Sequence, residues 1–129
     1  MIINVKPHAC PRPRVTRQGR TYYPMNYKVW TKEFKKAIEN MAVPSGCLHV
    51  DLVFIVKRPK ALKRPKTRVL HYKRPDLDNM VKSVLDALPI ADDARVVSLT
   101  AAKYYAAIDE EPHIELHLKQ ILDLKQIKS

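Results

Sequence analysis

The segment that decides the predicted fold of this 129-residue chain is RPDLDNMVKSVLDALPIADDARVV, residues 74–97. Its apolar residues recur at spacings of three and four: Met80, Val81, Val84, Leu85 and Leu88. This period predicts an amphipathic helix over 78–88, capped by Asp78 or Asp76 and stopped by Pro89. The β-branched run that follows, 94–106, predicts a strand. The segment is therefore expected to be a helix followed by a strand.

Three further strands are predicted from β-branched enrichment or alternation, at 2–6, 47–56 and 113–121, with 47–56 as a central strand. A second helix is predicted over 27–41 from an apolar stripe: Val29, Trp30, Phe34, Ala37, Ile38 and Met41. Proline-rich composition predicts an irregular arm over 10–24 and a loop over 57–74, and acidic residues predict a hairpin turn at 109–112. The sum is a single α+β domain over 1–129, with a mixed β-sheet and two main helices.

Five aspartates lie within residues 76–93, although the chain has a formal net charge of +11: Asp76, Asp78, Asp86, Asp92 and Asp93. Crowded carboxylates repel one another, so they require compensating positive charge. Lys82 supplies part of it, because it lies on one helix face with Asp78 and Asp86, and a divalent cation is the expected source of the rest. Asp92 and Asp93, at the start of the next strand, meet the loop before the helix only if that strand returns antiparallel or the short linker doubles back.

If these carboxylates meet, their oxygens suit Mg²⁺, with Mn²⁺ as a substitute. Such an ion polarises a phosphoryl group and generates hydroxide from bound water, while Lys82 neutralises charge in the transition state. The same residues also fit a purely structural role. Asp78 is then a helix cap, Lys82–Asp86 an i,i+4 surface pair and Asp92–Asp93 a turn.

The positive charge is concentrated in two segments that contain no acid, residues 1–32 and 57–74. Together with a sequence pI near 9.8, this pattern favours nucleic acid as the partner. The predicted DNA-binding residues come from both segments: Arg12, Arg14, Arg17, Arg20, Arg58, Lys73 and Arg74. A membrane surface is less favoured, because neither segment is an amphipathic helix with an aromatic face.

The chain is expected in a cytoplasm, since it shows neither a signal peptide nor an apolar run of membrane-spanning length. The two cysteines, Cys10 and Cys47, form the pairs His8-x-Cys10 and Cys47-x-His49. One intervening residue is a poor match to structural zinc sites, so reduced thiols and ordinary histidines are expected instead. A surface position is also predicted for both histidines of the last strand, His113 and His117.

DLDNMVKSVLDAL followed by DDARVV resembles the signature of the RusA family of Holliday junction resolvases, and PRPRVTRQGRTYYP resembles its N-terminal segment. The resemblance implies a homodimer that needs a divalent metal and makes paired symmetric nicks in four-way DNA junctions. It assigns the three essential acids to Asp76, Asp78 and Asp93, and the essential lysine to Lys82. Asp92 remains an alternative to Asp93, because the 89–91 linker is shorter than in the best-known member.

Two other functions remain open. A non-catalytic nucleic-acid-binding protein would also be basic, but it has no use for Asp76 and Asp78, which repel phosphate. A metal nuclease that acts on flaps or ordinary duplex would carry the same residues, because branch recognition depends on the shape of a dimer.

Overall fold

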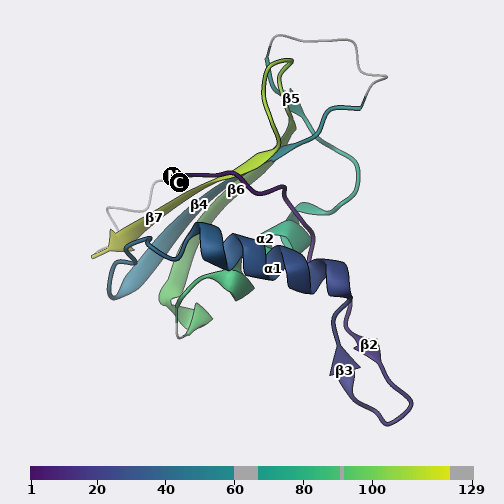
Figure 1. Ribbon diagram of the computed structural model, residues 1–129. Coiled ribbons are helices and arrows are strands. Elements are labelled where there is room, and N and C mark those ends of the chain that lie inside the picture. Colours follow the sequence, from purple (N-terminus) through teal and green to yellow (C-terminus); the bar gives the residue numbers. More distant parts are fainter. Residues whose placement is uncertain (60–66, 91, 123–129) are drawn as a thin grey trace.

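Five strands form the main sheet of the computed structural model: β1 (Ile2–Ile3), β4 (Cys47–Val56), β5 (Val69–Leu70), β6 (Val96–Tyr105) and β7 (His113–Ile121) (Figure 1). The structure describes residues 1–59, 67–90 and 92–122. The strand order is β1–β7–β4–β6–β5. β4 and β6 are parallel, whereas the other three pairings are antiparallel. The predicted mixed sheet and the central position of 47–56 are therefore confirmed.

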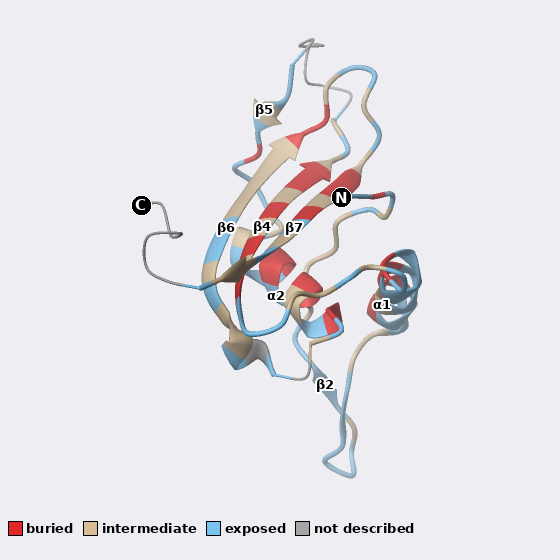
Figure 2. Ribbon diagram, turned by 90° about the vertical axis from the view of Figure 1, so that its left-hand side faces the viewer, coloured by how far each residue is buried: buried red, intermediate tan, exposed pale blue. Residues whose placement is uncertain are grey.

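Two helices, α1 (Met25–Ala37) and α2 (Leu77–Ala87), cover one face of this sheet (Figures 1 and 2). The side chains of β4 that face them are buried: Leu48, Val50, Leu52 and Phe54. Of these, Val50, Leu52 and Phe54 form one core cluster with Trp30 and Phe34 from α1 and with Met80 and Val84 from α2. The α+β fold is thus held by one apolar layer between the helices and the sheet.

The predicted hairpin between 94–106 and 113–121 is wrong, because β4 lies between β6 and β7. The chain leaves β4, forms α2 as a crossover helix and returns as β6 parallel to β4. Residues 106–112 then cross the end of β4 and deliver β7 to its other edge, where β7 pairs antiparallel. Alternation along a strand reports which face is buried, but it does not report which strand is the neighbour.

The N-terminal arm is also more regular than predicted. Within it, β2 (Arg14–Val15) and β3 (Thr21–Tyr22) form a two-stranded antiparallel hairpin that extends from the body of the protein (Figure 1). The Thr16 amide donates to the Arg20 carbonyl at 2.8 Å, and Gly19 adopts φ +80° in the turn. The prolines limit the arm to two short strands, and the turn at Gly19 joins these strands in a hairpin.

Element boundaries differ from the predictions in several places. α1 spans 25–37 and buries Tyr27, Trp30 and Phe34, while Val29 and Ala37 of the predicted stripe are exposed. Trp30, Phe34 and Ile38 of the predicted stripe are buried, so the helix face that packs on the sheet overlaps the predicted one and is turned from it only in part. The first strand covers only Ile2–Ile3, and a short 3₁₀ helix, η1 (Asp93–Arg95), occupies the predicted start of β6.

The basic block 57–74 is not wholly a loop, because β5 lies within it and pairs with β6. Part of this block, residues 60–66, falls outside the described ranges. Of the helices in the described ranges, none has both the length and the apolar character needed to cross a membrane.

The segment before the hairpin is fastened to both helices. The Trp30 indole nitrogen donates to the Lys6 carbonyl at 2.6 Å. On α2, the Ser83 hydroxyl donates to the His8 carbonyl at 2.6 Å, and the Cys10 amide donates to the Asn79 carbonyl at 2.9 Å. These bonds place the base of the basic hairpin beside the first turns of α2, which carry the predicted catalytic acids.

Candidate active site

The N-terminus of α2 lies at the carboxyl end of the parallel pair β4 and β6. A crossover helix between parallel strands runs back along them, so its first turn lies where those strands end. Lys103, near the end of β6, holds this junction: its Nζ donates to the carbonyls of Lys73 and Pro75, each at 2.6 Å. In open α/β sheets this end is where ligands bind.

Asp76 and Asp78 occupy this junction and are both exposed. Asp76 is the N-cap residue of α2, but its carboxylate makes no capping hydrogen bond. Among the residues that the structure describes, the Asp78 carboxylate accepts only from the amide of its neighbour Asn79, at 3.0 Å. Two carboxylates without a strong partner, beside the positive end of a helix dipole, form an arrangement that can bind a cation and its water shell.

Lys82 lies one turn further along α2 and pairs with Asp86, with Nζ and Oδ2 2.8 Å apart. The hydrogen bond that Lys82 donates to Asp86 raises the pKa of Lys82 above its ordinary value. The predicted i,i+4 surface pair is therefore formed. Asp78 and Lys82 are also successive positions on one helix face, but the Lys82 ammonium group reaches toward Asp86, the next position on that face.

Asp92 and Asp93 lie at the other end of the sheet. Asp92 accepts from the Ala94 amide at 2.9 Å, which is the turn expected on structural grounds. Arg95 ties this segment to the loop before β4, because its guanidinium donates to the carbonyls of Gly46 (2.9 Å) and Pro44. The segment is thus fixed at the amino ends of β4 and β6.

The fold therefore does not bring the backbone of Asp93 next to Asp76 and Asp78 within one chain. The eleven residues of α2 separate them by about 16 Å along the helix axis. The two ions of a two-metal site lie only about 4 Å apart. β6 does return antiparallel to α2, but this brings its end, at Lys103, beside the first turn of the helix, whereas Asp93 precedes β6 and stays at the other end.

The predicted DNA-binding residues fall into two groups, one at the carboxyl end of the parallel pair and one on the N-terminal arm, whose hairpin extends away from that end (Figures 1 and 2). Lys73 and Arg74 are exposed immediately before Asp76. The arginines of the arm are all exposed and lie on or beside the β2–β3 hairpin: Arg12, Arg14, Arg17 and Arg20. Arg58 follows the end of β4 and lines a large pocket. The structure adds three lysines that sequence reasoning did not single out, Lys6, Lys57 and Lys103, and no local pattern distinguishes them from other surface lysines.

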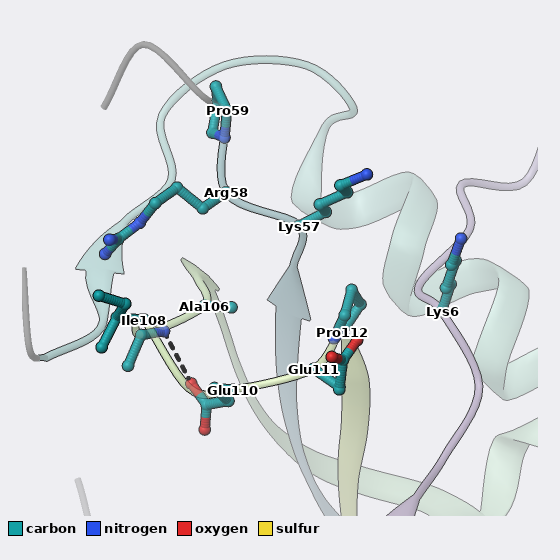
Figure 3. A pocket seen from close by; sticks show the side chains of 10 residues that line it. Lys6, Lys57, Arg58, Pro59, Ala106, Ile108, Glu110, Glu111 and Pro112 are labelled. Atoms are coloured by element: carbon teal, nitrogen blue, oxygen red, sulfur yellow. Dashed lines mark hydrogen bonds between the residues drawn. The ribbon is translucent and has the colours of Figure 1, made fainter. Parts of the chain in front are cut away.

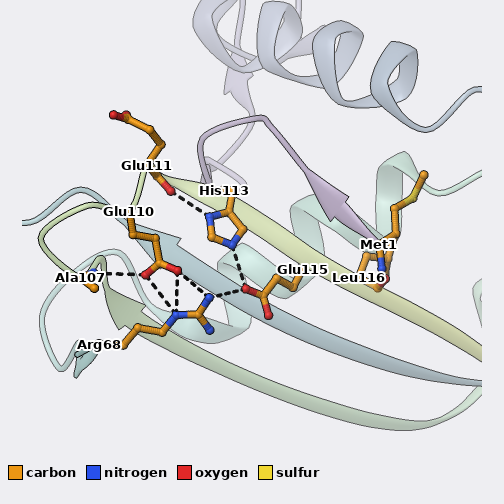
Figure 4. Close-up of polar contacts among 8 residues, drawn as sticks. All are labelled: Met1, Arg68, Ala107, Glu110, Glu111, His113, Glu115 and Leu116. Carbon is orange, nitrogen blue, oxygen red and sulfur yellow. Dashed lines mark hydrogen bonds and ion pairs between the residues drawn. The ribbon is translucent and has the colours of Figure 1, made fainter. Parts of the chain in front are cut away.

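A second acidic group lies beyond the end of β6, around Arg68 (Figure 4). Arg68 binds Glu110 at 2.7 Å and Glu115 at 2.5 Å, and His113 Nε2 lies 2.8 Å from Glu115. In the described part of the chain, Glu110, His113 and Glu115 are the one set of three side chains close enough to share an ion. Arg68 already occupies the centre of this set, so the arrangement is an ion-pair network. His113 is buried, contrary to the predicted surface position.

The pKa values of both glutamates fall below their ordinary range. For Glu110 the chief cause is the hydrogen bond from Arg68. For Glu115 burial acts in the opposite direction, but the hydrogen bonds from His113 and Arg68 outweigh it. Both carboxylates are therefore held in the charged form by the network.

Both cysteines are free thiols, Cys10 buried and Cys47 exposed. His49 is engaged elsewhere, because its ring nitrogens lie 2.8 Å from Ser98 Oγ and 2.8 Å from Asp51 Oδ1. The His8, Cys10, Cys47 and His49 pairs are not gathered into a ligand group in the described ranges.

Comparison with known proteins gives two findings. The family described as "Endodeoxyribonuclease RusA" matches residues 4–119. A segment of 68 residues is 40% identical to a Bacillus subtilis (strain 168) protein named "Uncharacterized protein YqaN". That segment covers 50% of this chain and 42% of the relative, so the chain matches less than half the length of that protein. The family match includes α2, β6 and both ends of the parallel pair, and on this evidence the chain belongs to the RusA endodeoxyribonuclease family.

Proposed function

We propose that residues 1–129 form one metal-dependent endonuclease domain that resolves four-way DNA junctions by paired symmetric nicks. The observation that carries the proposal is the α2 junction, where two exposed carboxylates, with no ion-pair partner within the described ranges, lie in a protein of net charge +11. A protein that only bound DNA would gain by neutralising Asp76 and Asp78, since they repel phosphate. The family match supports the same reading.

Asp76 and Asp78 are the proposed metal ligands at this junction, with Mg²⁺ as the ion and Mn²⁺ as a substitute. The fit rests on the chemistry of the donors: both side chains offer hard oxygen atoms, and the Asp76 carboxylate is not used to cap the helix. A bound ion supplies Lewis acidity and hydroxide from water. Lys82 places positive charge one turn away, where charge on the phosphate builds up during cleavage.

The third acid, Asp93, is proposed to act from the second subunit of a homodimer. Within one chain, its backbone lies at the opposite end of α2 from Asp76 and Asp78. A twofold axis that sets two α2 helices antiparallel puts the amino end of each beside the carboxyl end of the other. Two such composite sites, related by the twofold axis, account for paired symmetric nicks if each site cuts one strand. Asp92 has the same placement, but its carboxylate holds the Ala94 turn.

The DNA path is proposed to follow the basic residues around this junction. Lys73 and Arg74 immediately precede Asp76, so they are placed to hold the scissile phosphate. The hairpin residues Arg12 and Arg14 extend the path away from the sheet, and Arg17 and Arg20 lie beyond them at the turn. Arg58 contributes from the end of β4.

The deciding experiment incubates the purified protein with a mobile four-way junction, a flap and a linear duplex, each with and without Mg²⁺. Symmetric nicks in the junction that require the metal support the proposal, with Asp78→Asn inactive and the matched surface variant Glu33→Gln fully active. Preferred cleavage of the flap or the duplex would make the protein a nuclease of other specificity. Junction binding without cleavage under any metal would make it a non-catalytic binding protein.

A further inference from the structure

A pocket of about 790 Å³ opens at the carboxyl ends of β4 and β6 (Figure 3). Its walls come from residues that directly follow those strands, Lys57 to Pro59 and Ala106 to Ile108, and from Lys6. The Ala106 amide donates to the Val56 carbonyl at 2.8 Å, which holds the two strand ends together beneath it. The pocket therefore shares the ligand-binding end of the parallel pair with the first turn of α2.

The lining of this pocket combines positive charge with apolar surface. Lys6, Lys57 and Arg58 supply three cations. Of the two acids, Glu110 is neutralised by Arg68, and Glu111 is left on the exposed turn. The lining therefore stays net positive, which favours an anionic ligand.

The apolar part of the lining includes Ile108, an aliphatic side chain that is 47% exposed at the pocket wall. Figure 3 shows Ile108 beside Arg58 on one side of the pocket, with Lys57 and Lys6 on the other. The Arg58 Nε and Nη1 atoms are buried, so what the two residues can offer a base is the aliphatic stem of Arg58 and the exposed Ile108 side chain, an apolar surface against which its face can pack. The lysines opposite suit the phosphate of the same nucleotide.

The size of the pocket decides which form of DNA fits. Pockets of about 300–1,000 Å³ take small-molecule ligands, so this one holds a nucleotide and excludes a duplex. A base reaches such a pocket only after leaving the stack, and unstacking is least costly where pairing is already disturbed. In a four-way junction, that place is the branch point.

We propose that this pocket binds one unstacked nucleotide from the branch point, and that its occupancy distinguishes branched from linear DNA. The proposal deepens the proposed nuclease function, because it names the feature of the substrate that the α2 junction would cleave beside. Lys6 and Lys57 hold the phosphate, and Ile108 with Arg58 supports the base.

The test uses 2-aminopurine, a base whose fluorescence rises on unstacking, placed at the branch point of a junction and at the same position of a linear duplex. The full chain is titrated in EDTA, so that binding is followed without cleavage. We expect the junction fluorescence to rise on binding and the duplex fluorescence to stay unchanged. The Ile108→Ala variant should lower the ratio of junction to duplex affinity at least about fivefold, the scale of one lost stacking contact.

The double variant Lys6→Ala/Lys57→Ala should flatten the log-affinity versus log-salt slope for the junction by about two units. Ile108→Ala should leave that slope unchanged, because it removes no charge. The control is Lys119→Ala, an exposed lysine that pairs in register with His49 near the other end of β4. This control should alter neither the fluorescence nor the affinity ratio.

Equal weakening of junction and duplex by all pocket variants would overturn the proposal and leave the pocket a general phosphate contact. An unchanged fluorescence response in both pocket variants would overturn it as well. The outcome is separable from that of the proposed function. Loss of the response in the pocket variants of a protein that cleaves nothing would uphold the pocket and reject the nuclease. Normal junction cleavage by a protein whose pocket variants keep an unchanged response would uphold the nuclease and reject the pocket.

Discussion

The two acidic groups of this protein occupy different electrostatic surroundings. Asp76 and Asp78, at the start of α2, are exposed and make no ion pair among the described residues. Glu110 and Glu115, beyond β6 and on β7, share Arg68, and Glu115 also contacts His113 (Figure 4). The second group has the better metal-ligand spacing, yet its charges are already balanced by protein groups. Unbalanced charge, and not mere proximity of ligands, indicates where an external cation belongs.

The comparison predicts that substitutions at Asp76 or Asp78 change the cleavage activity, whereas substitutions in the Arg68 network change the stability of the fold. The largest expected effect is on cleavage. Asp78→Asn should reduce cleavage below detection, because the neutral amide replaces an anionic oxygen ligand of the proposed metal site. Junction binding should persist, since the change removes negative charge from a basic face. Single-turnover cleavage and a gel-shift titration measure the two quantities. Full cleavage by Asp78→Asn in Mg²⁺ would reject the site.

A mixture of inactive subunits tests the origin of the third acid. If Asp93 acts from the second subunit, a heterodimer of Asp78→Asn and Asp93→Asn keeps one intact site, so mixing the two inactive proteins should restore single nicks. If all the acids act within one chain, both sites of the heterodimer are damaged and the mixture stays inactive. Nicking is read on a supercoiled cruciform plasmid, with each variant alone as the control.

Lys82→Ala should lower the single-turnover rate by roughly two orders of magnitude, the scale seen when one preorganised electrostatic group is lost. The Lys82–Asp86 pair complicates this reading, so Asp86→Asn is the matched control. It breaks the same ion pair but keeps the ammonium group, and its rate should stay within a few-fold of the unmodified protein. A Lys82→Ala protein that reaches the normal rate at higher DNA concentration would instead assign this lysine to phosphate binding.

Neutralising basic residues should produce a graded effect on binding. Lys73→Ala/Arg74→Ala and Arg12→Ala/Arg14→Ala should each flatten the salt dependence of junction affinity by about two units, one for each lost phosphate contact. Only the first pair should also slow cleavage at saturating DNA, because Lys73 and Arg74 adjoin Asp76. A salt titration with both variants checks this. Unchanged slopes in both would mean that the DNA path lies elsewhere.

The smallest expected effect concerns the Arg68 network. Glu115→Gln should lower the free energy of unfolding by about 1–2 kcal/mol, with allowance for the partial exposure of the network, and leave cleavage within twofold. The pKa of Glu115 is lowered in the fold, so its stabilisation is present above its unfolded pKa and is lost as pH falls through the folded value. Urea unfolding at a series of pH values from 7 downward should therefore show a difference between the two proteins that is full at pH 7 and shrinks as the pH falls below the unfolded pKa. An equal difference at every pH would mean that the charge of Glu115 contributes nothing.

Local patterns predicted the elements with strong periodicity. The strand 113–121 matches β7, the strand 47–56 matches β4, and the α2 helix begins after Asp76 as one of the two proposed caps. Each of these depends on residues three or four positions apart, or on alternate residues, so the information is local. The burial of His113 was missed because strand alternation does not report what covers the first residue of a strand. In the fold, its ring lies 2.8 Å from the Glu111 carbonyl in the turn and 2.8 Å from Glu115 on β7.

The sequence by itself determined the α+β class, the two helices, the central strand, the basic character and the acids at the start of α2. The tertiary structure alone decided that β6 lies parallel to β4, that Asp93 and Asp76 stand at opposite ends of α2, and that Lys6 and Lys57 meet at one pocket. The physical reason is the distance along the sequence between the residues that interact. Periodicity and capping act within a few residues, whereas strand order and pocket lining depend on contacts between segments some fifty residues apart, as Lys6 is from Lys57.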